Sequence, residues 1–112
     1  MTSQLYYVYE LIDPIDNIVF YIGKGKNKRC YEHYRKVVGG RIANDTNYKL
    51  TNKLKQIISK GLQPIYNFPV TTSDETEAYA WEAAHIDYYG MDNLCNLCPG
   101  GEVYNPMKGN HH

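Results

Sequence analysis

The side chains of this sequence that are best suited to chemistry are two phenols and the run of cations that follows the second one. Tyr9 and Tyr21 flank a short polar turn, and Tyr21 opens the run Tyr-Ile-Gly-Lys-Gly-Lys-Asn-Lys-Arg. A glycine-spaced loop can offer its main-chain N–H groups to a phosphate, and lysines add positive charge. The candidate phosphate-binding residues of this run are Lys24, Lys26, Lys28 and Arg29. Because the run has neither Walker spacing nor Gly-x-Gly-x-x-Gly, it favours a phosphodiester over a nucleotide cofactor.

Two further residues could complete such a site. His33 follows Arg29 by four residues, so both would lie on one face of a helix over residues 28–38. Glu82 occupies a position in the apolar stripe of a later helix, where a carboxylate is costly unless it is paired or bound to a metal ion. A single carboxylate with open water positions suits Mg²⁺. The alternative is a surface glutamate at the edge of the stripe, salt-bridged to a lysine.

The two tyrosines must be positioned by a β-hairpin. Stretches rich in β-forming residues, 5–12 and 18–22, flank the turn. If the turn is centred on Ile15, Tyr9 lies opposite Tyr21 in the neighbouring strand. Because side chains alternate between the faces, one face would then carry Tyr7, Tyr9, Val19 and Tyr21. A slip of one residue would move one tyrosine to the other face, so this register can be tested.

The rest of the chain predicts helices and one more strand. We expect a helix over residues 28–38, a second over 47–60, a strand over 65–71, and a helix from a capping box at Thr72 to about Tyr89. The buried stripes of the first two helices would be Cys30, Tyr34, Val37 and Val38, and Leu50, Leu54, Ile57 and Ile58. Pro69 is typical of an edge strand. The expected fold is α+β in a single domain over residues 1–112.

The formal net charge is zero, but the charges are unevenly distributed. Residues 24–60 hold eleven Lys or Arg and two acids, a net charge of +9, whereas residues 61–112 hold seven acids and one lysine. A basic segment on a neutral protein can present a local surface that attracts nucleic acid. The alternative is that two lysine-rich helices simply expose solvated faces.

Length and composition set further limits. A chain of 112 residues, of which 43% are hydrophobic, suits one globular domain with a modest core. Three cysteines, an odd number, argue against a disulfide framework and for a reducing compartment. No run is apolar enough to span a bilayer, and the N-terminus lacks a signal-peptide pattern. We therefore expect a soluble, intracellular protein without a membrane partner.

In their order and spacing, the candidate residues resemble the GIY-YIG nuclease superfamily. The resemblance rests on Tyr7-Val8-Tyr9, Tyr21-Ile22-Gly23, Arg29, His33, Glu82 and Asn96, and it covers nearly the whole chain. The Tyr-Ile-Gly-Lys-Gly form is similar to a branch with a eukaryotic LEM-domain nuclease and small phage and bacterial proteins. Tyr7 stands where the family name has glycine, a departure that leaves Tyr9 intact. The fold of the family, a three-stranded, largely antiparallel sheet flanked by helices, agrees with the elements predicted above.

The resemblance implies a chemical role for each residue. Glu82 would hold one divalent ion, Mg²⁺ or Mn²⁺, at the phosphate. Tyr9 would take a proton from the attacking water, although a free phenol, with a pKa of about 10, is a poor base at neutral pH. His33 is the alternative base, because its pKa starts nearer the ideal value. Arg29 would stabilise the extra charge of the transition state.

The resemblance also implies catalytic roles for Tyr21 and Asn96. Tyr21 would orient water or phosphate, and Asn96 would tie the C-terminal loop to the site. On this interpretation the chain is a metal-dependent endonuclease that hydrolyses DNA phosphodiester bonds. The alternative is a catalytically silent nucleic-acid-binding or regulatory domain with the same fold. Because the sequence shows no separate DNA-reading module, specificity would come from the domain's own loops, from a homodimer or from a partner protein.

Overall fold

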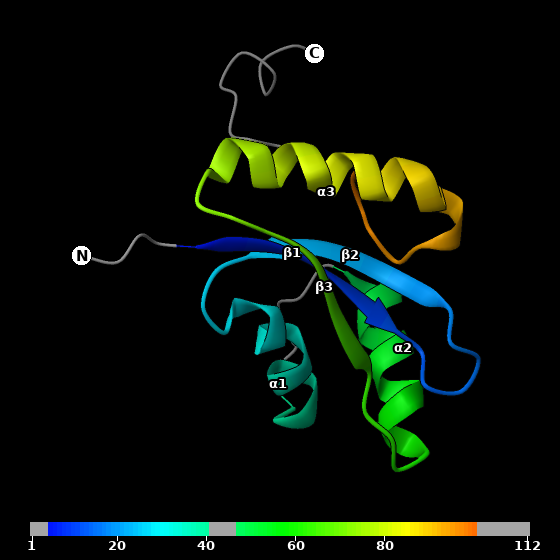
Figure 1. Cartoon of the computed structure of the whole chain (residues 1–112). Coiled ribbons are helices and arrows are strands. Elements are labelled where there is room, and N and C mark those ends of the chain that lie inside the picture. The colour runs from blue at the N-terminus through cyan, green and yellow to red at the C-terminus, as the bar shows by residue number, and fades with distance from the viewer. Residues whose placement is uncertain (1–4, 41–46, 101–112) are drawn as a thin grey trace.

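A three-stranded antiparallel sheet lies between two layers of helices (Figure 1). The computed structural model of the chain describes residues 5–40 and 47–100. The strands are β1 (Tyr6–Ile12), β2 (Val19–Gly25) and β3 (Ile65–Thr72), in the sheet order β2-β1-β3. The helices are α1 (Glu32–Val38), α2 (Tyr48–Ser59) and α3 (Glu75–Tyr89), with short 3₁₀ turns η1 (Arg29–Tyr31) and η2 (Met91–Asn93). The predicted α+β fold is confirmed, and β3, which contains Pro69, is an edge strand as expected.

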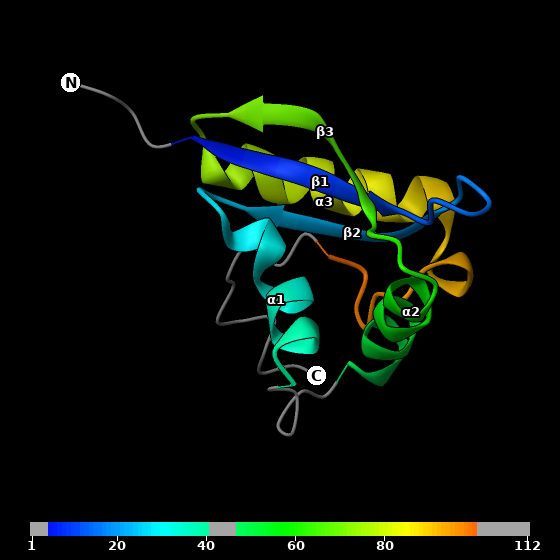
Figure 2. The ribbon, with the colours of Figure 1, turned by 90° about the horizontal axis from the view of Figure 1, so that it is seen from below.

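The two faces of the sheet have separate cores, because side chains alternate along each strand. α1 and α2 cover one face and α3 covers the other, as the two perpendicular views show (Figures 1 and 2). The core under α2 consists of Leu11, Phe20, Leu50, Leu54 and Ile57. The core under α3 consists of Val8, Ile22, Ile86 and Leu94. The face that a strand residue occupies therefore decides which site it can join.

The hairpin pairs two residues further along β2 than the sequence predicts. Tyr9 lies opposite Gly23, and Tyr7 lies opposite Gly25 instead of Gly23. The expected pairing of Tyr9 with Tyr21 is therefore wrong. Because the shift is an even number of residues, the two tyrosines still share one face of the sheet and become diagonal neighbours.

Two features of the hairpin displace its register. The loop closes with a hydrogen bond of 3.0 Å from the Asp13 N–H to the Ile18 carbonyl, one residue later than in the predicted turn. A bulge at Phe20 then adds a further residue to β2. Because of the bulge, Phe20 and Tyr21 both face the layer of α1 and α2. Val19, expected beside the tyrosines, packs instead in the core under α3.

The first two helices lie close to their predicted bounds. The helix expected over residues 28–38 begins with η1, continues as α1 and ends at Gly39. Asn47 caps α2, since its side-chain oxygen accepts a hydrogen bond of 3.0 Å from the Leu50 N–H. Val38, predicted in a buried stripe, is exposed because α1 ends there. The other members of the two stripes are buried or half-buried.

The N-terminus of α3 differs from the predicted capping box. The cap is Asp74 and not Thr72: the Asp74 carboxylate accepts a hydrogen bond of 2.9 Å from the Thr76 N–H. Thr72 instead accepts from the Asp74 N–H and donates to the Glu77 carboxylate. Neither α3 nor any other helix in the described part of the chain is long and apolar enough to cross a membrane.

Asn96 ties the C-terminal segment to the outer edge of β2. Its side-chain oxygen accepts from the Ile22 N–H at 3.0 Å, and its side-chain amide donates to the Ile22 carbonyl at 2.7 Å. The Cys95 N–H donates to the Phe20 carbonyl at 2.7 Å. Both bonds of Asn96 are buried. The segment after η2 therefore satisfies main-chain groups that an edge strand would otherwise leave unpaired.

We predict that Asn96→Ala lowers the free energy of unfolding by about 2–4 kcal/mol, because two buried main-chain groups lose their partner. Asn93→Ala is the matched control, since Asn93 also bonds a main-chain carbonyl, that of Tyr89, but at an exposed position. The control should change the free energy of unfolding by less than about 1 kcal/mol. Urea denaturation measures both values, and equal losses would contradict the proposed pairing at the β2 edge.

Candidate active site

A pocket of about 190 Å³ opens on the face of the sheet that α1 and α2 cover. Four of the predicted catalytic residues line this phenol pocket: Tyr9 from β1, Tyr21 from β2, Arg29 from η1 and His33 from α1. The lining also includes residues outside the predicted site, among them Glu32, Tyr34, Lys36 and Tyr66. The hairpin and the first helix therefore bring together phenols, an imidazole and a guanidinium.

The ring of Tyr9 lies directly over Gly23. A Cβ added to Gly23 would lie 2.5 Å from the Tyr9 hydroxyl oxygen and would overlap the ring itself. No larger residue fits at this position unless the ring moves. The Tyr9 and Tyr21 rings are tilted neighbours, with centroids 6.2 Å apart. Glycine opposite Tyr9 therefore determines where this phenol lies in the pocket.

Tyr7 organises the cationic loop from the next position on the same face. Its hydroxyl donates to the Asn27 carbonyl at 2.7 Å and accepts from the Cys30 N–H at 3.2 Å. The two bonds bracket a turn in which Asn27 has a φ of +54°. Burial raises the pKa of Tyr7 to about 12, even though the bond from the Cys30 N–H acts in the opposite direction, so its hydroxyl keeps the proton that it donates. Arg29 consequently projects from a fixed turn.

Lys24 forms an ion pair with an acidic side chain, whereas Arg29 does not among the described residues. Arg29 is exposed at the phenol pocket and has no acidic partner in the described part of the chain. The Lys24 ammonium pairs with the Glu75 carboxylate of α3 at 2.6 Å and lies over the rings of Tyr6 and Tyr79. This hydrogen bond lowers the pKa of Glu75. Lys24 therefore holds α3 against the sheet, and its charge is partly neutralised.

His33 lines the phenol pocket, whereas two of the predicted phosphate-binding lysines do not. Lys26 is half-buried and Lys28 is exposed, and neither lines the phenol pocket. His33 Nε2 lies 3.1 Å from Oγ1 of the buried Thr51, a contact that joins α1 to α2. This contact holds the imidazole ring at the wall of the pocket. Lys26 and Lys28 therefore lie outside the phenol pocket.

Two phenols of the pocket, those of Tyr9 and Tyr66, have raised pKa values. Burial raises the pKa of Tyr9 well above its ordinary value, and the neighbouring Tyr21 adds to the shift. Burial also raises the pKa of Tyr66. The Tyr66 hydroxyl is buried and has no hydrogen-bond partner among the described residues. An unsatisfied buried donor in the same pocket as Arg29 is suited to an anionic oxygen, which would accept the missing bond.

Sequence reasoning missed Tyr66 and Glu32 as lining residues. Tyr66 of β3 lies opposite Leu11 of β1. A bulge between Val70 and Asn67 shifts the pairing of β3 with β1 by one residue. The alternation of side chains along a strand does not reveal where such a bulge lies. Glu32 follows Arg29 by three residues, a spacing that puts both on one side of a helix. That signal was available and would have found Glu32.

Glu82 and Asn96 do not line the phenol pocket. Glu82 belongs to α3, on the opposite side of the sheet (Figure 1). Its half-buried side chain packs against Gly100, where an added Cβ would lie 3.3 Å from Glu82 Cγ. Asn96 is bonded to Ile22 at the edge of β2, so the segment from Asn96 to Gly100 connects that edge with Glu82. The six predicted residues thus form two groups, four in the pocket and two along this segment.

A sequence model of the LEM-3-like GIY-YIG domain matches residues 7–111 of the chain. The chain belongs to this GIY-YIG family. The match spans the candidate site from Tyr9 to Asn96 and confirms the superfamily that the sequence predicts. No curated protein and no solved structure matches the chain.

GIY-YIG nucleases generally depend on a divalent metal ion, so the fit of the residues to such an ion matters. Within residues 5–40 and 47–100, no group of three or more His, Cys, Asp or Glu side chains could hold one. Mg²⁺ does not require an all-protein cage, because one or two carboxylates, water and substrate phosphates suffice. Glu82 and the pocket residue Glu32 are suitable oxygen donors. The residues therefore fit an ion that binds together with a phosphate.

We predict that Gly23→Ala destabilises this GIY-YIG domain by about 1–3 kcal/mol, because the new Cβ would overlap the Tyr9 ring. In a Tyr9→Ala background the same substitution should be neutral or stabilising, since glycine is unfavourable within a strand. A double-mutant cycle on the free energy of unfolding measures the coupling. An equal cost in both backgrounds would mean that the Tyr9 ring does not lie over Gly23.

Proposed function

We propose that this GIY-YIG domain is a metal-dependent endonuclease that hydrolyses DNA phosphodiester bonds. The main support is the phenol pocket, in which Tyr9, Tyr21 and Tyr66 share the lining with Arg29. A phosphodiester is an anion with several acceptor oxygens, so hydroxyl donors and a guanidinium complement it. α1 and α2 cover this face and belong to the segment of residues 24–60 with a net charge of +9. Such a segment would draw DNA to the pocket.

Each residue would act on a different part of the diester. Arg29 would contact the non-bridging oxygens and stabilise the charge that develops in the transition state. Tyr66 would donate its unpaired O–H to the same group. Tyr21 would orient the phosphate or the attacking water. Lys26 and Lys28 would bind the neighbouring phosphates along the strand.

Glu82 would hold the divalent ion at the edge of β2. A diester bound beside Tyr21 would have to extend past the Asn96 segment, which covers the β2 edge at Ile22, to reach Glu82. The carboxylate would supply one ligand, and water and phosphate oxygens would supply the rest. Mg²⁺ or Mn²⁺ bound there would neutralise charge on a non-bridging oxygen and on the leaving oxygen. Asn96 would support this arrangement by fixing the segment that connects the β2 edge with Glu82.

Either Tyr9 or His33 would accept the proton of the attacking water. The raised pKa of Tyr9 disfavours the phenolate that a base requires. Tyr9 would serve only if the cations of the bound complex lowered its pKa again. His33 lines the same pocket, and an imidazole has a reference pKa of about 6.5, nearer to neutral pH.

A second candidate function is a catalytically silent domain that binds nucleic acid. Two observations favour it: Glu82 does not line the phenol pocket, and the pKa of Tyr9 is raised in the protein without ligands. Such a domain would bind DNA through Arg29 and the lysines without needing a divalent ion. Cleavage and binding assays separate the two functions.

We predict that the protein nicks supercoiled plasmid with Mg²⁺ or Mn²⁺ and does not nick it in EDTA. Glu82→Gln should slow nicking roughly 100-fold while DNA binding persists, because charge stabilisation by the ion is lost. Glu32→Gln is the matched control, since this carboxylate lines the phenol pocket itself. It should retain its activity in the same plasmid assay.

Several outcomes of this assay would contradict the proposal. If the wild type binds the plasmid but does not nick it, the nuclease is rejected in favour of the silent domain. If Glu32→Gln is inactive and Glu82→Gln is active, the ion binds in the phenol pocket and not at the β2 edge. Loss of both cleavage and binding in Glu82→Gln would indicate that Glu82 is needed for the fold.

The pH dependence of nicking distinguishes the two bases. With Tyr9 as the base, the single-turnover rate should rise about tenfold per pH unit up to at least about pH 9, because a raised pKa leaves little phenolate. With His33 as the base, the rate should level off above about pH 7. The rates are measured at constant metal concentration and ionic strength. A rate that falls as the pH rises would exclude both bases.

A further inference from the structure

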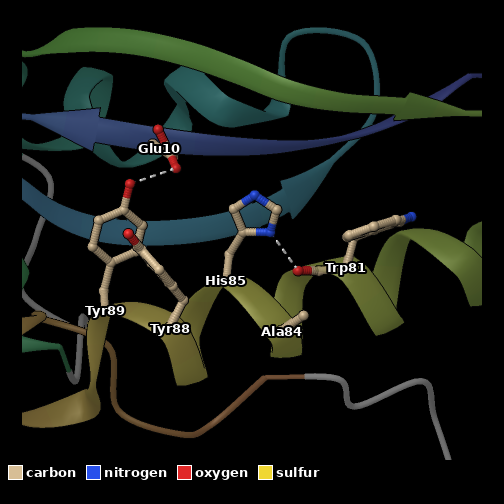
Figure 3. A pocket seen from close by; sticks show the side chains of 6 residues that line it. All are labelled: Glu10, Trp81, Ala84, His85, Tyr88 and Tyr89. Carbon is tan, nitrogen blue, oxygen red and sulfur yellow. Dashed lines mark hydrogen bonds between the residues drawn. The ribbon is translucent and has the colours of Figure 1, made fainter.

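A second pocket, of about 310 Å³, lies on the side of the sheet that α3 covers (Figure 3). It is lined by Glu10 of β1 and by Trp81, Ala84, His85, Tyr88 and Tyr89 of α3. The aromatic rings form two edge-on pairs, with centroids 6.2 Å apart for Trp81 and His85 and 5.1 Å apart for Tyr88 and Tyr89. Trp81 is 45% and Tyr88 is 81% exposed. α3 therefore presents aromatic surface to the solvent at this pocket.

The carboxylate of this aromatic pocket is buried without a cation. Glu10 is 5% exposed, and its oxygens accept hydrogen bonds from Asn67 Nδ2 at 2.8 Å and from the Tyr89 hydroxyl at 3.1 Å. Both donors are neutral, and no Lys or Arg of the described residues pairs with Glu10. A buried carboxylate without an opposite charge is costly. Each of its oxygens can still accept another hydrogen bond.

The charges of α3 have a single sign. The helix contains Glu75, Glu77, Glu82 and Asp87 and no Lys or Arg. Acids beside electron-rich rings repel phosphate and attract cations. The basic helices α1 and α2 lie on the opposite face of the sheet (Figure 1). The aromatic pocket therefore complements a cation and not a phosphate group.

We propose that the aromatic pocket of Glu10, Trp81, His85, Tyr88 and Tyr89 binds an arginine side chain of a partner protein. A guanidinium is planar, so it can stack on aromatic rings while it donates to a carboxylate. It is also more weakly hydrated than an ammonium group, which makes its burial beside Glu10 less costly. Because this pocket and the phenol pocket lie on opposite faces, a partner could bind here without covering the phenol pocket.

The single tryptophan of the sequence makes the proposal testable by fluorescence. Trp81 lines the aromatic pocket, so its emission reports on this site alone. The full chain is titrated with N-acetyl-arginine amide and with the matching citrulline and lysine compounds at constant ionic strength. We expect a saturable change with the arginine compound in the millimolar range, which is usual for so small a ligand. Citrulline, which has the shape of arginine but no charge, should cause no such change, and lysine should bind more weakly.

Three variants locate the binding. Tyr88→Ala should weaken it roughly two- to fivefold, because one aromatic wall is lost. Tyr48→Ala is the matched control, an exposed tyrosine of α2, and should leave binding unchanged. Glu10→Gln should weaken it roughly tenfold or more. Glu10→Gln should not lower the melting temperature, since the carboxylate has no cationic partner to lose.

Each of the following results would overturn the proposal. The citrulline compound could bind as well as the arginine compound, or lysine could bind more tightly than both. Glu10→Gln could bind the arginine compound unchanged, which would place the ligand elsewhere. Finally, the wild type could self-associate while Tyr88→Ala does not. The occupant of the aromatic pocket would then be a second copy of the chain.

Discussion

The fit of the Tyr9 ring over Gly23 is the contact on which the candidate site depends. Because the ring overlaps the space of any Cβ at Gly23, the two residues can be neighbours only if one of them has no side chain. This contact places the Tyr9 phenol beside Tyr21 and within reach of η1, where Tyr7 fixes the loop that leads to Arg29. A glycine in the motif is therefore a spatial requirement of the phenol pocket and not only a source of backbone freedom.

The sheet separates two kinds of chemistry because its side chains alternate. The face under α1 and α2 gathers phenols and cations, which suits a phosphodiester. The face under α3 gathers acids and exposed aromatic rings around Glu10, which suits a cation. A chain with no net charge can thus present a basic surface and an acidic surface at the same time. The β2 edge, where Asn96 binds Ile22, is the boundary between them.

Much of the fold and part of the site could be predicted from the sequence. Periodicity located the helices, and the motif residues Tyr9, Tyr21, Arg29 and His33 line one pocket, as their shared sheet face and shared helix face predict. The hairpin register could not be predicted, since the bulge at Phe20 depends on packing in the core under α2. The pairing of Lys24 with Glu75 was equally hidden, because it joins residues 51 positions apart through tertiary contacts. The place of Glu82 relative to the pocket depends on how α3 lies across the sheet, which local patterns do not encode.

Paramagnetic relaxation by Mn²⁺ can show whether the two groups of predicted residues meet at one ion. The measurement uses the isotope-labelled protein, a short duplex with a phosphorothioate linkage that resists cleavage, and substoichiometric Mn²⁺. We predict that the strongest broadening affects the amides of Ile22, Gly23 and Glu82, because the proposed ion would lie between Glu82 and the β2 edge. Broadening centred on Glu32 in α1, or no specific broadening in the presence of the duplex, would contradict this arrangement.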